Sequence, residues 1–144
     1  MFGAIQNAVS GLQASAKRVQ ASASNIANAR DSIAMKDARI DPVQMAPAVG
    51  PNGGNNVYEP ITVQQESVEG GGTRASFVPI NPPHVAVYAP DDPLADSQGM
   101  VARPNVDMAT ELVNMRQAET AYRANVKTIQ TENEMLGALL DKET

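Results

Sequence analysis

The sequence predicts a mainly α-helical fold in which long N- and C-terminal helices pair as a coiled-coil hairpin, with a small antiparallel β patch and loops between them. All ten prolines lie between Pro42 and Pro104, so the residues that break helices are confined to the middle of the 144-residue chain. Both terminal arms carry apolar residues at alternating three- and four-residue intervals, which is the spacing of coiled coils. We therefore expect three regions: a discontinuous helical coiled-coil domain of residues 1–33 and 105–144, a flexible linker of residues 34–56, and a β hairpin and loop region of residues 57–104.

The N-terminal arm is predicted to form one helix from Phe2 to Ala29, roughly 42 Å long at about 1.5 Å per residue. Its apolar stripe has heptad spacing and consists of Phe2, Ile5, Val9, Leu12, Ala16, Val19, Ala23 and Ile26. The remaining faces carry only Lys17 and Arg18 as charged residues, among Gln, Asn, Ser, Ala and Gly. A helix that faces water is normally richer in charge, so this pattern favours contacts with neighbours on several sides over a charge-poor helix facing solvent.

The middle of the chain is predicted to contain a linker followed by short strands. Residues 39–56 show no apolar periodicity and are rich in Pro, Gly and Asn, as expected of a flexible connection. Local alternation of apolar and polar residues predicts strands within residues 58–68, 73–80 and 84–88. Because Gly70 to Gly72 separate the first two, we expect a small antiparallel hairpin or a three-stranded patch.

The C-terminal arm repeats the pattern of the first helix. Asn105 is the expected N-cap, and Asp107 places a negative charge in the first turn. The apolar stripe, which Glu119 and Asn133 interrupt, consists of Met108, Leu112, Met115, Tyr122, Val126, Ile129, Leu136 and Leu140. Glu119 and Arg123 are expected to form an ion pair across one turn. A two-helix hairpin with alanine-rich seams buries little surface, so we expect intermolecular packing to supplement it.

The composition excludes several classes of function. The net charge of −5 argues against a nucleic-acid partner, which requires a basic surface. The absence of cysteine excludes disulfides, thiolate nucleophiles and cysteine-ligated metals. No apolar run approaches the roughly 20 residues of a membrane span, and the N-terminus has neither the basic nor the apolar block of a cleavable secretory signal. These features fit a cytoplasmic protein, or one exported by a route that reads an uncleaved N-terminus.

No catalytic, cofactor or metal site is predicted, and we do not expect an enzyme. Residues 70–73 lack the lysine and the following helix of a phosphate loop, so a turn is favoured. Asp91, Asp92 and Asp96 miss the spacing of an EF-hand and are interpreted as turn or helix-capping residues. His84 is the only histidine in a chain without cysteine, which favours a structural role over a zinc site.

Motifs in both terminal arms resemble those of the axial proteins of the bacterial flagellum. The run from Ser24 to Ala29 reads Ser-Asn-Ile-Ala-Asn-Ala and follows an upstream Ser10-Gly11-Leu12. This arrangement is similar to the signature shared by rod, hook and hook-associated proteins. One departure lies at residues 28–31, which read Asn-Ala-Arg-Asp where the family usually has Asn-Ala-Asn-Thr.

The C-terminal half resembles one member of that group more specifically. Residues 92–96 (Asp-Pro-Leu-Ala-Asp), 99–101 (Gly-Met-Val) and 104–107 (Pro-Asn-Val-Asp) are similar to the segment that leads into the C-terminal helix of proximal rod proteins of the C type. Residues 111–115 (Glu-Leu-Val-Asn-Met) and 118–126 resemble the helix that follows. The similarity covers about the first 30 residues and the stretch from Val85 to the end.

The resemblance implies a structural subunit of the proximal rod of the flagellar basal body, a tubular drive shaft that crosses the periplasmic space and transmits torque. It further implies type III export of the unfolded chain without a cleaved signal peptide, followed by self-assembly. The implied partners are further copies of the chain, other rod proteins, the membrane ring, the ring–rod junction protein and, during secretion, the export apparatus. No cofactor, nucleic acid or small-molecule substrate is implied. Two alternatives stay open: another short flagellar axial component, and a small helical type III export chaperone or adaptor.

The expected assembly interface combines the large apolar residues of the two stripes with asparagines of the motifs. Its residues are Phe2, Ile5, Val9, Leu12, Val19, Asn25, Ile26, Asn28, Leu112, Met115, Tyr122, Asn125, Val126, Ile129, Leu136 and Leu140. Charge-poor helix faces suit the wall of a tube, because buried unpaired charges are costly.

Overall fold

The computed structural model describes residues 2–38, 40 and 58–141. In chain order the elements are α1 (Phe2–Asn28), the 3-10 helix η1 (Met35–Asp37), β1 (Ile61–Ser67), β2 (Thr73–Pro79), β3 (His84–Tyr88), β4 (Met100–Pro104) and α2 (Met108–Leu140). Both predicted terminal helices are present, and β1, β2 and β3 lie within the predicted strand segments. Most of the predicted linker, residues 41–56, lies outside the described residues.

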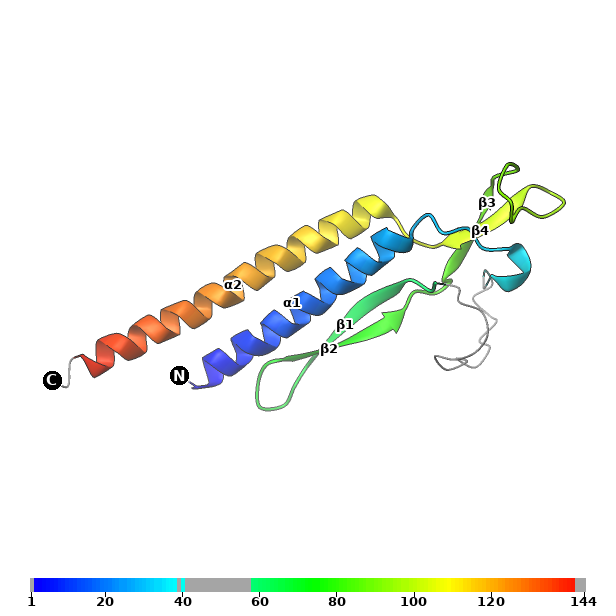
Figure 1. Ribbon diagram of the computed structural model, residues 1–144. Coiled ribbons are helices and arrows are strands. Elements are labelled where there is room, and N and C mark those ends of the chain that lie inside the picture. The colour runs from blue at the N-terminus through cyan, green and yellow to red at the C-terminus, as the bar shows by residue number, and fades with distance from the viewer. Residues whose placement is uncertain (1, 39, 41–57, 142–144) are drawn as a thin grey trace.

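The helix α1 forms the middle layer of the molecule (Figure 1). α2 runs antiparallel along one side of it, and the β1–β2 hairpin follows the other side. The antiparallel direction is evident in the contacts, because Gly11 lies against Asn125 while Ser22 bonds to Glu111. Contacts on two sides explain why α1 carries so few charged residues, as its sequence predicted.

The two helices differ in length, and α2 extends past the beginning of α1 (Figure 1). α2 has 33 residues against 27 in α1. The beginning of α1 and the end of α2 lie at the same end of the molecule, and the β3–β4 ribbon lies at the other. Neither helix contains a stretch apolar enough to span a bilayer within the described part of the chain.

The described strands form two separate two-stranded antiparallel sheets, β1–β2 and β3–β4, so the three-stranded alternative is wrong. β4 is absent from the predicted strands because residues 100–104 (Met-Val-Ala-Arg-Pro) do not alternate between apolar and polar side chains. Ile33 forms a bridge to Ala102, with N–H···O distances of 2.9 Å in both directions, while β3 pairs with the other edge of β4. Val101 and Ala102 are fully buried as a result.

The turn between β1 and β2 requires glycine for two reasons. Gly70, Gly71 and Gly72 have φ angles of +94°, +104° and +88°, which side chains disfavour. The turn also rests on α1, where a Cβ added to Gly71 would lie 2.8 Å from Asn7 Oδ1. The backbone N–H of Thr73 donates to Ser10 Oγ at 3.0 Å. The predicted turn is confirmed, and it docks the tip of the hairpin onto the first turns of α1.

The N-cap of α2 is Asp107 rather than the predicted Asn105. Asp107 accepts hydrogen bonds from the hydroxyl of Thr110 at 2.6 Å and from the N–H of Ala109 at 3.1 Å. The hydroxyl bond, followed by the backbone bond, lowers the pKa of Asp107. Asn105 belongs to the end of the β ribbon, because its backbone and side-chain N–H groups donate to the carbonyls of Pro83 and Pro82.

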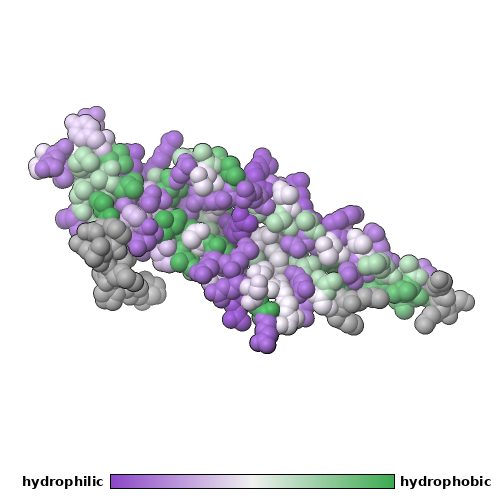
Figure 2. All heavy atoms as spheres, turned by 180° about the vertical axis from the view of Figure 1, so that it is seen from behind, coloured by the Kyte–Doolittle hydropathy of each residue, from purple (hydrophilic) through white to green (hydrophobic). Residues whose placement is uncertain are grey.

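The surface of the molecule alternates between hydrophilic and hydrophobic regions (Figure 2). Hydrophobic atoms gather at the end that carries β3 and β4 and again near the end of α2. On α2 the predicted ion pair of Glu119 with Arg123 is confirmed at 2.5 Å, and Arg116 adds a second contact at 3.2 Å. Both arginines are largely exposed, so these pairs contribute only a few tenths of a kcal/mol each.

Candidate assembly interface

A cluster of polar side chains, which we call the polar node (Ser22, Asn25 and Glu111), lies buried where α1 meets α2. The hydroxyl of Ser22 donates to Glu111 Oε2 at 2.6 Å, and Asn25 Nδ2 donates to Glu111 Oε1 at 2.6 Å. Asn25 is fully buried, and Glu111 is 9% exposed. Both oxygens of the carboxylate are therefore bonded to donors on successive turns of α1, which offsets the cost of burying its charge.

Asn25 also joins the helices to the β1–β2 hairpin. Its Nδ2 donates to the carbonyl of Ile61 at 2.8 Å, and its Oδ1 accepts from the N–H of Ile61 at 3.0 Å. The hydroxyl of Tyr58 donates to the same Oδ1 at 2.7 Å. An asparagine side chain has two donor hydrogens and two acceptor sites, and all four are used here. Asn25 is thus the point at which all three layers of the molecule are bonded together.

Tyr58 extends this network toward the β3–β4 ribbon. Its carbonyl lies 3.0 Å from Nε2 of the buried His84, which confirms a structural role for that histidine. Burial raises the pKa of the Tyr58 hydroxyl, the bond to Ser24 opposes this rise, and the nearby Glu111 carboxylate adds to it.

The faces of α1 and α2 that meet are lined by small or polar residues. We call these faces the seam: Ala8, Gly11, Ser15, Ser22 and Asn25 on α1, and Glu111, Ala118 and Asn125 on α2. Ala8, Ser15 and Ala118 are buried together with the polar node. A Cβ added to Gly11 would lie 2.6 Å from Asn125 Nδ2, so the helices approach closely at this point. Close approach requires small side chains, which explains why alanine, glycine and serine occupy the seam.

The predicted apolar stripe of α1 lies one residue beyond the seam. Leu12 follows Gly11, and Ile26 follows Asn25, so each is rotated by about 100° from the seam position before it and by about 40° from the seam position four residues earlier, Ala8 and Ser22. The two stripes therefore flank the seam instead of forming its centre, and the predicted coiled-coil pairing of the stripes is not confirmed. At Gly11 and Asn125 the helices approach too closely for the larger stripe side chains to occupy these positions.

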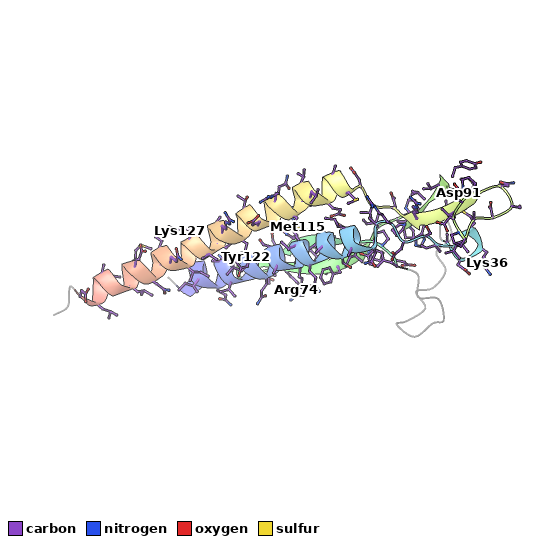
Figure 3. The ribbon with its side chains drawn as sticks, turned by 45° about the horizontal axis from the view of Figure 1, so that its top comes forward. Lys36, Arg74, Asp91, Met115, Tyr122 and Lys127 are labelled. Atoms are coloured by element: carbon purple, nitrogen blue, oxygen red, sulfur yellow. The ribbon has the colours of Figure 1, made fainter. Side chains whose placement is uncertain are left out.

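The large stripe residues are half-buried or exposed along the flank of the helix pair. Val9 on α1 and Leu112 and Tyr122 on α2 are 41%, 53% and 43% exposed. Half-buried members are Ile5, Leu12, Val19, Ile26, Met115, Val126, Ile129 and Leu136. In Figure 3, Met115 and Tyr122 lie along the border between α2 and α1. Leu140 is 70% exposed near the end of α2, and nothing is described of the Phe2 side chain.

The three asparagines predicted in the assembly interface lie in different surroundings. Asn25 is inside the polar node, so it is a contact within the chain. Asn28 and Asn125 are half-buried and donate to carbonyls of their own helices, Ser24 and Ala121, at 2.8 and 3.0 Å. Glu111 was not among the predicted residues, because a single glutamate near the start of an exposed helix gives no sequence signal of burial.

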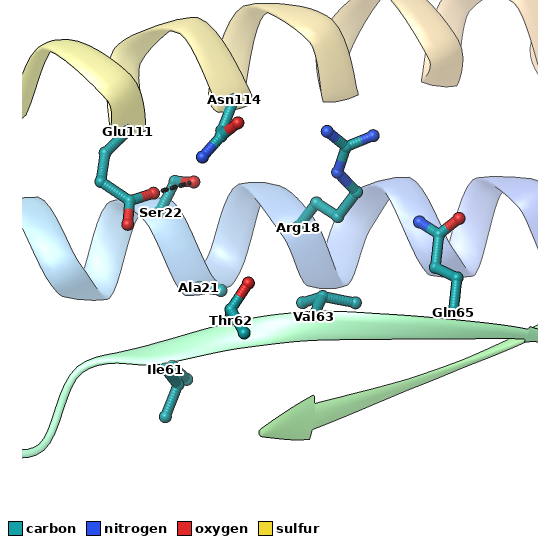
Figure 4. A pocket seen from close by; sticks show the side chains of 9 residues that line it. All are labelled: Arg18, Ala21, Ser22, Ile61, Thr62, Val63, Gln65, Glu111 and Asn114. Carbon is teal, nitrogen blue, oxygen red and sulfur yellow. Dashed lines mark hydrogen bonds between the residues drawn. The ribbon is translucent and has the colours of Figure 1, made fainter. Parts of the chain in front are cut away.

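A cleft of about 290 Å³ opens beside the polar node, between α1, β1 and α2. Its walls include Arg18, Ile61, Val63, Glu111 and Asn114 (Figure 4). The Arg18 guanidinium donates to Gln117 at 3.4 Å, while the carboxylate of Glu111 points toward α1 and bonds to Ser22.

A second, open groove of about 610 Å³ runs along α2 and is mainly apolar. It is lined by Leu112, Val113, Arg116, Gln117, Thr120, Ala121 and Ala124. The cleft beside the node is thus polar and enclosed by three elements, whereas the groove lies on one helix and is open to a neighbour.

The acidic loop between β3 and β4 behaves as a set of turns, as predicted. Asp92 Oδ1 accepts from the N–H of Leu94, and Asp96 Oδ1 accepts from the N–H groups of Gln98 and Met100. Asp92 also accepts a bond from the Ser32 hydroxyl at 2.5 Å, which is the main cause of its lowered pKa. Among the described residues no group of three His, Cys, Asp or Glu side chains could hold a metal ion.

The chain is similar to proteins of the bacterial flagellum. Residues 97–142 match the family described as flagellar basal body rod FlgEFG protein C-terminal. The chain is 34% identical over 131 residues to the flagellar basal-body rod protein FlgC of Salmonella typhimurium, a match that covers 88% of this chain and 86% of the relative. It is 33% identical over 127 residues to the FlgC of Escherichia coli O6:H1, again covering 88% and 86%. The FlgC of Agrobacterium fabrum is 30% identical over 134 residues, covering 92% and 87%.

Proposed function

The chain belongs to the FlgC family of flagellar basal-body rod proteins, and we propose that its apolar stripes are the surfaces through which it contacts neighbouring subunits. It is a structural protein of the flagellar basal body and serves motility. We assign it to the proximal rod, where torque passes through the contacts between subunits.

The exposure of the stripes is the observation that carries this proposal. Within the chain, the seam already joins α1 to α2, and the hairpin covers the other side of α1. Large apolar side chains such as Val9, Leu112 and Tyr122 nevertheless stay 41% to 53% exposed. Exposed apolar residues that are regularly spaced along a helix are typical of a surface that another molecule covers. We therefore place the coiled-coil contacts indicated by the heptad spacing between subunits.

The small residues of the seam, together with the exposed stripes, fit the expected route of assembly. A chain whose intramolecular seam consists of small residues gains little from folding alone, because burial of small side chains stabilises less than burial of large ones. Such a chain unfolds easily for type III export and gains further stability when neighbours cover its stripes at the tip of the growing rod. We propose copies of itself, other rod proteins, the membrane ring and the ring–rod junction protein as neighbours, and a structural role without catalysis.

Two matched variants test the assembly role of the stripes. Leu112 on α2 and Leu94 in the β3–β4 loop are 53% and 47% exposed, so either can be changed to Asp without burying a charge in the isolated chain. We expect Leu112→Asp to be secreted normally, to be absent from basal bodies stripped of hook and filament, and to abolish swimming. Leu94→Asp should be incorporated and support swimming. Normal incorporation of Leu112→Asp would refute the assignment of the stripe to subunit contacts.

A further inference from the structure

α1 presents two faces that could pair with α2, one residue apart in the sequence. The seam face carries Ala8, Gly11, Ser15, Ser22 and Asn25, and it is the face that pairs in the structure. The apolar stripe would bury larger side chains if it faced α2 instead. On apolar burial alone, pairing through the stripes would be favoured. Some other interaction must therefore decide in favour of the seam.

The polar node supplies that interaction. Glu111 can reach its two donors only when Ser22 and Asn25 face α2, since they lie three residues apart on the same side of α1. A rotation of α1 by one residue would bring Ala23 and Ile26 to these positions, and neither side chain can donate to a carboxylate. The rotation would also remove both hydrogen bonds between Asn25 and Ile61.

The hydrogen bonds between α1 and the β1–β2 hairpin depend on the same orientation of α1. Ser10 Oγ accepts from the N–H of Thr73 at 3.0 Å, and Lys17 Nζ donates to the carbonyl of Ala75 at 2.7 Å. Of these contacts, only the polar node also includes α2. The node is thus the one described cluster that ties the orientation of α1 to both of its neighbours.

We infer that the polar node selects the face through which α1 and α2 pair, and thereby keeps the apolar stripes free for neighbouring subunits. Without the node, the stripes would pair within the chain. The chain would then be more stable by itself but would lack its contact surface. In some coiled coils a single buried polar residue likewise fixes one arrangement of the helices at a cost in stability.

Cysteine cross-linking can measure which face is paired, because the sequence contains no cysteine. The first probe is Gly11→Cys with Asn125→Cys, because these two positions lie against each other across the seam. The second is Val9→Cys with Val126→Cys, which lie on the two stripes. Each pair is introduced separately into the full chain, and the yield of intramolecular disulfide is measured by gel mobility under oxidising conditions.

Each probe is then placed in three further backgrounds. Asn25→Leu with Glu111→Leu removes the node. Gln20→Leu with Glu134→Leu is the matched control, since it also replaces one amide on α1 and one carboxylate on α2, at exposed positions. Glu111→Gln is the conservative variant, because an amide can accept from Asn25 and donate to the Ser22 hydroxyl.

We expect the ratio of seam to stripe cross-links to fall about tenfold in the node variant, the shift expected when one arrangement loses a buried hydrogen-bonded group. The control and Glu111→Gln should keep the wild-type ratio. An unchanged ratio in the node variant would overturn the inference. A loss of helix content by circular dichroism would overturn it too, because a hairpin paired through the larger side chains of the stripes should hold the helices together more firmly.

A second measurement links face selection to assembly, and this link rests on the proposed function. The node variant should be secreted in normal amounts and be absent from basal bodies, whereas the control should be incorporated. The cross-link ratio is read on the purified chain and does not depend on rod assembly. A shifted ratio with normal incorporation would therefore refute the role of the stripes in the rod and leave face selection standing.

Discussion

Two faces of α1, the seam and the apolar stripe, lie one residue apart in the sequence and differ in almost every physical respect. Ala8 is 3% exposed, whereas the adjacent Val9 is 41% exposed. The seam consists of small and polar side chains that let the helices approach closely, and the stripe consists of larger apolar ones. The less hydrophobic face is thus the one buried within the chain. The small side chains therefore form the surface that pairs within the chain, and the larger apolar ones form the surface that we propose for contacts with neighbouring subunits.

The sharpest way to break this comparison is to place the same charge on each face. We expect Ala8→Asp to lower the free energy of unfolding by about 3 kcal/mol, because it places a carboxylate at a position that is only 3% exposed. Val9→Asp should change it by no more than about 0.5 kcal/mol, since position 9 is exposed. Chemical denaturation of the purified chain measures both values. The distinction between the faces fails if the two substitutions destabilise the chain equally.

The same two variants should exchange their ranking when assembly is measured. Val9→Asp is expected to fold, to be secreted and to fail to enter the rod, because its charge would be covered by a neighbouring subunit. This outcome separates a defect in folding from a defect in contact between subunits.

Replacing either of two helical glycines by alanine should change the free energy of unfolding by a smaller amount, and in opposite directions at the two positions. Gly137→Ala should raise the free energy of unfolding by about 0.5 kcal/mol, because alanine favours the helix and nothing lies within 4 Å of the added Cβ. Gly11→Ala should lower it by about 1 kcal/mol, because the new Cβ displaces Asn125 from the seam. Thermal unfolding of the two variants beside the parent chain provides the measurement. Stabilisation by Gly11→Ala would mean that the helices approach less closely than described.

The smallest expected effect is on the free energy of unfolding at alkaline pH. It acts through Tyr58, which bonds to Asn25 of the seam. Burial raises the pKa of Tyr58 above its ordinary value of 10.0. A raised pKa in the folded state means that the contribution of Tyr58 is complete below pH 10 and is lost as the pH rises through the folded value. The ionised hydroxyl can no longer donate to Asn25, so the polar node loses one of its bonds.

We therefore expect the free energy of unfolding to fall with pH above 10, and to fall less steeply in Tyr58→Phe. Tyr88→Phe is the control, because Tyr88 is 69% exposed on β3 and distant from the node. Denaturation curves over this pH range, combined with tyrosinate absorbance, measure the dependence. Equal slopes in the parent chain and Tyr58→Phe would show that Tyr58 does not support the node.

Much of the secondary structure follows from local patterns. Both terminal helices, the strands β1 to β3, the glycine turn and the pair of Glu119 with Arg123 lie where they were predicted. Each depends on residues close together in the chain, such as a three- or four-residue repeat or a run of glycines. β4 was missed because its residues do not alternate between apolar and polar, and its bridge to Ile33 joins residues that are far apart in the sequence. The N-cap was misplaced because Asn105 is already bonded to the carbonyls of Pro82 and Pro83.

The candidate interface was predicted in part. The stripes were correctly identified as regularly spaced apolar surfaces, and their assembly role stays a proposal. The pairing of the two stripes with each other within the chain is not confirmed, and Asn25, which was predicted as a contact between subunits, is fully buried in the node. Glu111 could not be predicted, because a glutamate in the first turn of a helix is normally explained by the helix dipole.

The sequence alone determines that this chain forms two long terminal helices separated by a breaker-rich middle, because proline, glycine and heptad spacing act through local backbone geometry. It also determines the two faces of each helix, since these follow from side-chain size and periodicity. Only the tertiary structure decides which face pairs within the chain. That choice depends on hydrogen bonds among Ser22, Asn25, Ile61 and Glu111, which are far apart in sequence and meet only after folding. Periodicity carries no information about which distant donor an acceptor will meet, so the two pairings are distinguished in three dimensions alone.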